Sequence, residues 1–168
     1  AEDIKSGLKP GEFVGAFYVT KCAGASEDGV EVGKNLCYRC KNGGRPQVMV
    51  FTRSTNDKNV VKLIQELDKA IADNSEKELR AFVNVLGEDK EELNSTAKEI
   101  AKESKAQNVP FVVPNEFENG PDNYGLNSKA EVTIILANGG QVKANHAVAS
   151  AKDLKVADVI ADVKKLVN

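Results

Sequence analysis

The alternation of strand and helix patterns across the middle of the chain constrains the fold more than any other feature. Short apolar runs at residues 47–52, 79–86 and 109–113 are bounded by turn residues and have the length of buried strands. Between them, residues 57–74 and 89–107 repeat apolar side chains at intervals of three and four, as amphipathic helices do. Strands that alternate with helices run mainly parallel, with helices covering the sheet. We therefore predict an α/β fold.

The ends of the chain extend this pattern. Asn138-Gly139-Gly140 separates two strand-like runs and predicts a hairpin. Pro110 interrupts the run at 109–113, which places that strand near an edge or a bend. The other expected elements are a polar lead-in at 1–10, a strand at 11–22, hairpin strands at 131–137 and 141–146, and a helix at 153–167. Residues 11–168 are expected to form a single domain.

Length, composition and charge limit the possible functions. The 168 residues, 41% hydrophobic and 29% charged, suit one domain with a real core. A net charge of -2 does not indicate that the chain as a whole binds nucleic acid or an anionic membrane. No apolar run approaches the roughly 20 residues of a membrane span. No cofactor is indicated, and the oligomeric state is left open.

The sequence begins with Ala1-Glu2-Asp3, and no Met stands before them. Cleavage of a bacterial signal peptide commonly leaves Ala at the new end, so we expect an exported protein of the periplasm or cell envelope. A chain trimmed at this point would begin in the same way. In an exported protein disulfides persist, and three cysteines allow at most one intrachain bridge.

Three stretches resemble a known family: 11–17, the Gly-Arg-Pro and apolar strand at 44–51, and 124–142 with its Tyr-Gly-Leu, strand and Gly-Gly turn. The family is the thioredoxin-like superfamily, in its peroxiredoxin and periplasmic thiol-reductase branch. The resemblance covers roughly residues 11–168. It implies a thioredoxin-like fold, with a central mixed sheet flanked by helices and an N-terminal β-hairpin extension.

Two departures from the family concern its chemistry. The family places its reactive cysteine after the first central strand, where this chain has residues 52–57 and no cysteine. It places a cis-proline before the strand at Val132, where residues 129–133 contain no proline. We therefore expect no peroxidase activity. The hydroxyls of Ser54 and Thr55 are expected to cap the following helix, a role that Asn56 or Asp57 can also fill.

The chain does carry a displaced CxxC, Cys37-Tyr38-Arg39-Cys40. Its sulfurs can meet if the backbone turns, but not on a straight strand. Basic residues surround the motif and residues 32–56 contain no acid, which favours the thiolate, with Arg39 as a modulator of the pKa. We therefore expect thiol–disulfide exchange with a protein partner. By analogy with other CxxC pairs, a solvent-reachable Cys37 attacks and Cys40 resolves.

Other roles for these cysteines stay open. The motif can be a structural bridge, formed by Cys37 with Cys40 or by either of them with Cys22. Cys22, Cys37, Cys40 and His146 also make a possible Cys3His metal set, although only one close-spaced pair is present and no metal site is assigned. Each of these alternatives implies a non-catalytic binding module. Because Cys22 ends an apolar strand, we expect it to be the unpaired, buried thiol.

Overall fold

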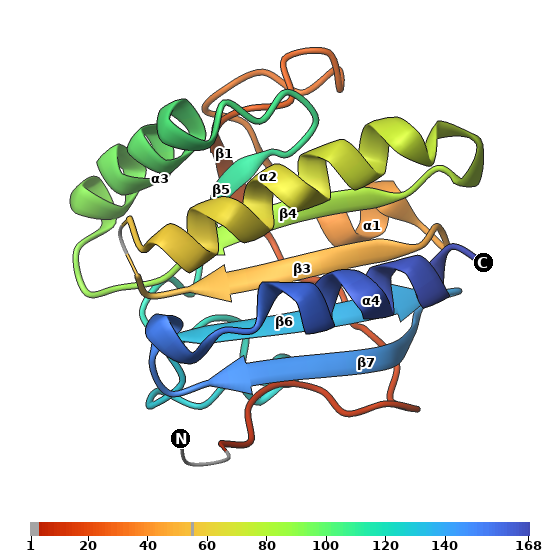
Figure 1. The fold of residues 1–168 in the computed structure, drawn as a ribbon. Coiled ribbons are helices and arrows are strands. Elements are labelled where there is room, and N and C mark those ends of the chain that lie inside the picture. The colour runs from red at the N-terminus through yellow and green to blue at the C-terminus, as the bar shows by residue number, and fades with distance from the viewer. Residues whose placement is uncertain (1–3, 55) are drawn as a thin grey trace.

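The strands form one seven-stranded mixed sheet in the order β2-β1-β5-β4-β3-β6-β7 (Figure 1). The computed structural model describes residues 4–54 and 56–168, so the predictions for Ala1–Asp3 and Thr55 lie outside the described residues. The strands are β1 (Val19–Ala23), β2 (Asn35–Leu36), β3 (Gln47–Thr52), β4 (Arg80–Val85), β5 (Phe111–Pro114), β6 (Val132–Asn138) and β7 (Gln141–Val148). The helices are α1 (Tyr38–Asn42), α2 (Lys58–Asp73), α3 (Lys90–Ser104) and α4 (Val156–Leu166), with 3-10 turns η1 (Ser75–Lys77), η2 (Asp122–Tyr124) and η3 (Ala151–Asp153).

The predicted α/β core is confirmed. β3 pairs in parallel with β4, and β4 with β5, while α2 and α3 form the crossovers. On the other side of β3, β6 and β7 add antiparallel strands. Gly139 and Gly140 both have positive φ angles, 64° and 78°, which the predicted tight hairpin requires. The sheet is thus mixed, as the family resemblance implied.

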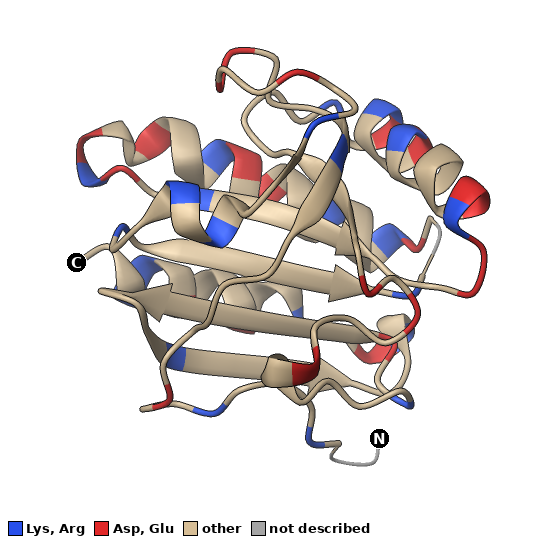
Figure 2. Ribbon diagram, turned by 180° about the vertical axis from the view of Figure 1, so that it is seen from behind, with Lys and Arg blue, Asp and Glu red and all other residues tan. Residues whose placement is uncertain are grey.

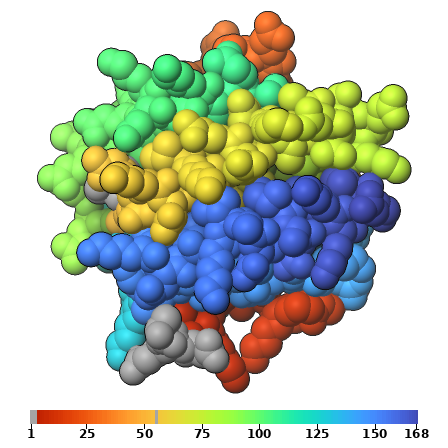
Figure 3. All heavy atoms as spheres, in the orientation of Figure 1, coloured from red at the N-terminus to blue at the C-terminus, as the bar shows by residue number. Residues whose placement is uncertain are grey.

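Two layers cover the sheet. Figure 3 shows α3, α2 and α4 side by side over one face, and their apolar sides pack on alternate residues of the central strands. The view from behind in Figure 2 shows the opposite face, crossed by the N-terminal segment and the short α1. This second face is built around a ring cluster in which Phe17 lies 4.8 Å from Tyr124 and 5.9 Å from Phe82 between ring centroids. Both faces of the central strands are therefore buried.

The expected strand at 11–22 is wrong for most of its length. Only Val19–Ala23 forms a strand, β1, which pairs antiparallel with β2 and β5 and gives the N-terminal hairpin extension. Residues 11–14 instead lie along the far edge of the sheet, where Gly11 N–H donates to Val142 O and Val14 N–H donates to Gly140 O. The segment between crosses the sheet and buries Phe17, so this ring serves packing rather than strand pairing, while Ala16 and Tyr18 are exposed.

Of the two positions predicted for the third strand, near an edge or at a bend, the edge is wrong. β5 lies inside the sheet, between β1 and β4. Pro110 stands just before the strand, which begins at Phe111, so its missing N–H interrupts no ladder within β5. Among the described residues, no helix is long and apolar enough to cross a membrane.

Candidate functional site: the Cys37–Cys40 turn

The CxxC motif forms the first turn of α1, just before β3. Cys37 is the N-cap, with an extended backbone, and its Sγ accepts a hydrogen bond from Cys40 N–H at 3.0 Å. Gly43 ends the helix with φ 61°, and its N–H donates to Cys40 O. The two cysteines are joined by a disulfide with a Cα–Cα distance of 5.2 Å. The turn that lets the two sulfurs meet is therefore present, and of the pairings left open by the sequence the structure has Cys37 with Cys40.

The two cysteines differ in exposure. Cys37 is 7% exposed and thus buried, whereas Cys40 is exposed. The expectation that Cys37 is the solvent-reachable cysteine is therefore wrong. The reason is local: Cys37 precedes Tyr38, whose ring enters the core and draws the start of α1 inward. Cys40 lies three residues later in the helix and faces solvent.

Tyr38, between the cysteines, is fixed at both ends of its side chain. It is 2% exposed and its ring lies 5.7 Å from that of Phe82. Its hydroxyl donates a 2.6 Å hydrogen bond to Asp28 Oδ2. Burial raises the pKa of Tyr38 far above its ordinary value, and the bond to the Asp28 carboxylate adds to the rise. Tyr38 is therefore a neutral hydrogen-bond donor.

Sequence reasoning missed the partners of Tyr38. Asp28 lies in the glycine-rich loop after β1, and its other oxygen accepts from the Lys21 ammonium at 2.8 Å. Burial would raise the pKa of Asp28, but hydrogen bonds from Lys21, Tyr38 and the Val30 N–H outweigh it and hold the pKa below its usual value. One signal was available: a lysine inside an otherwise apolar strand needs a buried acceptor.

Two of the basic residues around the motif, Arg39 and Arg45, have partners of their own. Arg39 donates from Nε to Val14 O at 3.1 Å and from Nη1 to Gly43 O at 3.2 Å. Arg45 lies 3.5 Å from the Glu78 carboxylate. The acid-free stretch of sequence is therefore not free of acid in space. The effect of Arg39 on a thiol pKa stays a prediction.

Cys22 is free and buried in β1, as expected. Burial raises the pKa of its thiol, although Lys98 and Lys90 oppose the rise. His146 lies on β7, where its Nε2 is 2.7 Å from Asp162 Oδ2. β1 and β7 are five strand spacings apart, about 24 Å, so the Cys3His metal set is not brought together. Within the described residues no group of three or more potential ligands could hold a metal ion.

At the carboxyl end of β3, where the family places its cysteine, the described residues Thr52, Arg53 and Ser54 make hydrogen bonds. Thr52 Oγ1 accepts from Ser54 N–H at 3.0 Å, and Arg53 Nη1 donates to Glu118 O at 2.7 Å. Asp57, rather than Ser54, caps α2 by accepting from two backbone N–H groups. The described residues contain no cis peptide bond. About 17 Å of strand separates this end of β3 from the end beside α1.

Solved structures match this architecture over nearly the whole chain. A putative thiol:disulfide interchange protein DsbE from Chlorobium tepidum is 12% identical, with a TM-score of 0.68 over 96% of this chain and 99% of that one. AhpC from Mycobacterium tuberculosis is 10% identical, with a TM-score of 0.65 over 96% and 99% of the two chains. A putative protein disulfide isomerase from Bacteroides thetaiotaomicron is 13% identical, with a TM-score of 0.65 over 96% and 92%.

The chain has a thioredoxin-like fold. The resemblance seen in the sequence to the peroxiredoxin and thiol-reductase branch is confirmed at the level of the fold. No family model matches the sequence, and no curated protein matches it. The neighbours therefore establish the architecture, and the chemistry must be argued from the cysteines of this chain.

Proposed function

We propose that this protein exchanges its Cys37–Cys40 disulfide with the thiols of a protein partner. The observation that carries the proposal is the asymmetry of the pair: Cys40 is exposed and Cys37 is buried. An incoming thiolate must reach the sulfur that it attacks. Cys40 is the exposed residue of the pair, so we assign the attacked sulfur to Cys40, which reverses the roles expected from the sequence.

The exchange needs no cofactor. A partner thiolate attacks Cys40 Sγ, the Sγ–Sγ bond breaks, and its electron pair passes to Cys37 Sγ. A second partner thiolate then attacks the partner sulfur of the mixed disulfide and releases the Cys40 thiolate. The partner dithiol is oxidised to a disulfide, and Cys37 and Cys40 become the reduced pair.

The turn supports Cys37 as the leaving group. Its Sγ accepts the Cys40 N–H at 3.0 Å, and a hydrogen bond to the charged form of a group favours that form. A more stable thiolate leaves faster. Arg39 and Lys41 belong to the same helix, so the local charge has the sign that favours a thiolate.

Peroxidase activity is not part of the proposal. The absence of a cysteine in residues 52–57 supports this view, because peroxide reduction in the family's usual geometry needs a thiolate there. Thiol-dependent peroxide consumption that survives Cys37→Ser but is lost in Ser54→Ala or Thr55→Ala would contradict it.

Equilibration of the native protein with reduced and oxidised glutathione tests the exchange. We expect the pair to open and close with the glutathione ratio while the protein stays folded. The Cys22→Ser variant is the matched background, because it removes the one cysteine outside the pair. A pair that opens only when the protein unfolds would contradict the proposal.

A second candidate is a non-catalytic binding module with a structural disulfide. The burial of Cys37 and Tyr38 favours it, since a bridge that fixes α1 to the core needs no solvent access. The same glutathione titration separates the two candidates. In either case the disulfide supports an oxidising location outside the cytosol, which we include in the proposal. The redox state of Cys37 and Cys40 in acid-quenched cells tests that location.

A further inference from the structure

A continuous chain of hydrogen bonds joins the CxxC turn to the loop between β1 and β2. Tyr38 Oη donates to Asp28 Oδ2 at 2.6 Å, and Asp28 Oδ1 accepts from Lys21 Nζ at 2.8 Å. Tyr38 belongs to α1, Asp28 to the loop and Lys21 to β1. Three segments of the chain therefore meet at one carboxylate.

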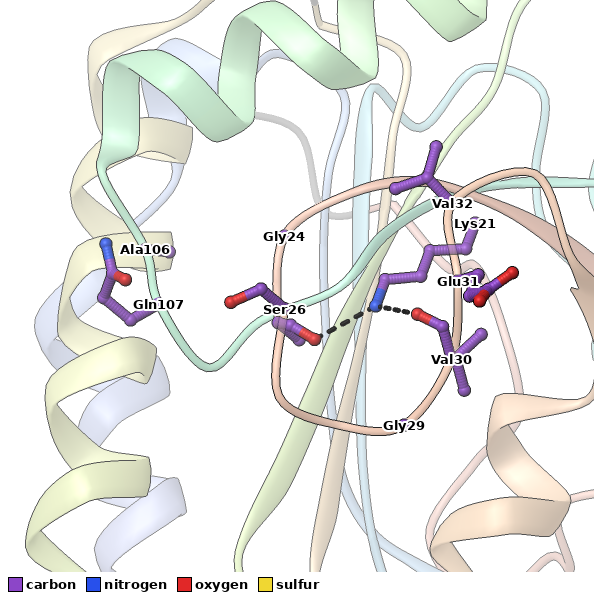
Figure 4. Close-up of a pocket in the computed structure, with 10 residues that line it drawn as sticks. Lys21, Gly24, Ser26, Gly29, Val30, Glu31, Val32, Ala106 and Gln107 are labelled. Atoms are coloured by element: carbon purple, nitrogen blue, oxygen red, sulfur yellow. Dashed lines mark hydrogen bonds between the residues drawn. The ribbon is translucent and has the colours of Figure 1, made fainter.

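The Lys21 ammonium organises the loop. It is 1% exposed, and besides Asp28 it donates to Ala25 O at 3.0 Å and Val30 O at 2.8 Å. Figure 4 shows the Lys21 side chain ending within this loop. All three N–H donors of the ammonium are used, so the loop surrounds a cation that has no hydrogen bond left to make. The carboxylate of Asp28 then has one oxygen left to hold Tyr38.

We propose that Tyr38, held by Asp28 and Lys21, is a positioning residue that sets the redox equilibrium of Cys37 and Cys40. The proposal rests on the exchange function proposed above and deepens it. Tyr38 is one of the two residues between the cysteines, and its anchored side chain holds the turn after the disulfide opens. The cysteines of the reduced form then stay close to the arrangement that they need to re-form the bond.

The direction of the effect follows from chain entropy. Without the hydroxyl of Tyr38, the reduced turn gains conformational freedom that it must lose again when the bond closes. The dithiol is then favoured over the disulfide. Linkage makes the effect reciprocal: if the anchor favours the disulfide, the disulfide strengthens the anchor by the same factor. Reduction of the pair is therefore expected to loosen the loop from Ala25 to Val30.

The test compares Tyr38→Phe with wild type in glutathione buffers, where one protein disulfide and two glutathione thiols give the protein dithiol and oxidised glutathione. The change keeps the ring contact with Phe82 and removes only the hydroxyl. We expect the equilibrium constant for disulfide formation to fall about tenfold. The reduction potential of the Cys37–Cys40 pair then rises by about 30 mV. Tyr18→Phe is the control, because Tyr18 is an exposed tyrosine. A shift below threefold in Tyr38→Phe, or an equal shift in Tyr18→Phe, would overturn the proposal.

A second measurement keeps this inference separate from the exchange function. The unfolding equilibrium of the oxidised protein, and of protein reduced with dithiothreitol, is measured with and without Tyr38→Phe. We expect the variant to raise the unfolding constant about tenfold more in the oxidised form than in the reduced form, which closes the same thermodynamic cycle. If glutathione fails to open the native pair but this difference is present, the exchange function fails and the positioning role stands. Equal effects on both forms would refute the positioning role.

Discussion

The two ends of β3 differ in what the chain has placed on them. At the amino end, α1 holds a disulfide whose exposed member is Cys40. The turn is anchored through Tyr38 to the ion pair of the buried Lys21 with the partly exposed Asp28. At the carboxyl end, the side chain of Thr52 accepts a local hydrogen bond, and the side chain of Asp57 caps α2. The resemblance seen in the sequence implies a reactive cysteine at the carboxyl end of β3, whereas the disulfide of this chain lies beside the amino end.

The thioredoxin-like core of this chain therefore forms without a cysteine at the carboxyl end of β3. The carboxyl end keeps the geometry that starts a long helix, which the fold needs in any case. The amino end has gained a short helix, an anchored tyrosine and a disulfide, none of which the parallel core requires. A disulfide can therefore stand at the amino end of β3 in a chain with a thioredoxin-like fold.

The largest expected effect comes from removing the cysteines at the amino end. Cys37→Ser combined with Cys40→Ser is expected to abolish disulfide exchange with a reduced model protein, because Cys22 is buried and lies in another strand. Ser54→Ala at the carboxyl end is the matched control and is expected to keep the wild-type rate within about twofold. Exchange that survives the double variant would show that the comparison between the two ends is mistaken.

The sequence predicted the central architecture well and the site incompletely. The spacing of apolar residues, together with the turn residues, identified β3 to β7 and the three long helices. Each of these elements buries apolar side chains at regular intervals along its own sequence. Residues 11–18 were misassigned, since apolar residues in a crossing segment look the same as those in a strand. The pairing of Cys37 with Cys40 was one of the predicted options. The contact of Tyr38 with Asp28, and of Asp28 with Lys21, depends on how a loop folds back, which no local pattern reveals.

The second-largest expected effect, on the free energy of unfolding, comes from breaking the ion pair between Asp28 and Lys21. Asp28→Asn is expected to lower the free energy of unfolding by about 3 kcal/mol at pH 7, because it leaves the buried Lys21 ammonium without a counter-charge. The native pKa of Asp28 is lowered, so the carboxylate stabilises the fold fully above the ordinary value of about 3.9. That stability is lost as the pH falls through the lower native pKa.

Denaturant unfolding of both proteins between pH 7 and pH 2 checks this sign. The difference in the free energy of unfolding between wild type and Asp28→Asn is expected to become smaller as the pH drops below about 4. A gap that stays constant over this range, or widens at low pH, would mean that Asp28 is not the anion that holds the loop.

A smaller effect is expected at the carboxyl end. Asp57→Ala removes the cap of α2, where Oδ1 accepts from Asn59 N–H at 2.7 Å and from Val60 N–H at 3.4 Å. The free energy of unfolding should fall by about 1 kcal/mol. The glutathione equilibrium of the folded protein should stay unchanged, since the cap lies at the far end of β3. A changed equilibrium would show that the two ends are coupled.

The most direct test of the central claim is to map which sulfur accepts an incoming thiol. The folded, oxidised protein is exposed briefly to reduced glutathione, quenched with acid, and the glutathione adduct is located by peptide mass spectrometry. We expect the adduct on Cys40, the exposed member of the pair. An adduct mainly on Cys37 or Cys22, or no adduct while the protein remains folded, would contradict it.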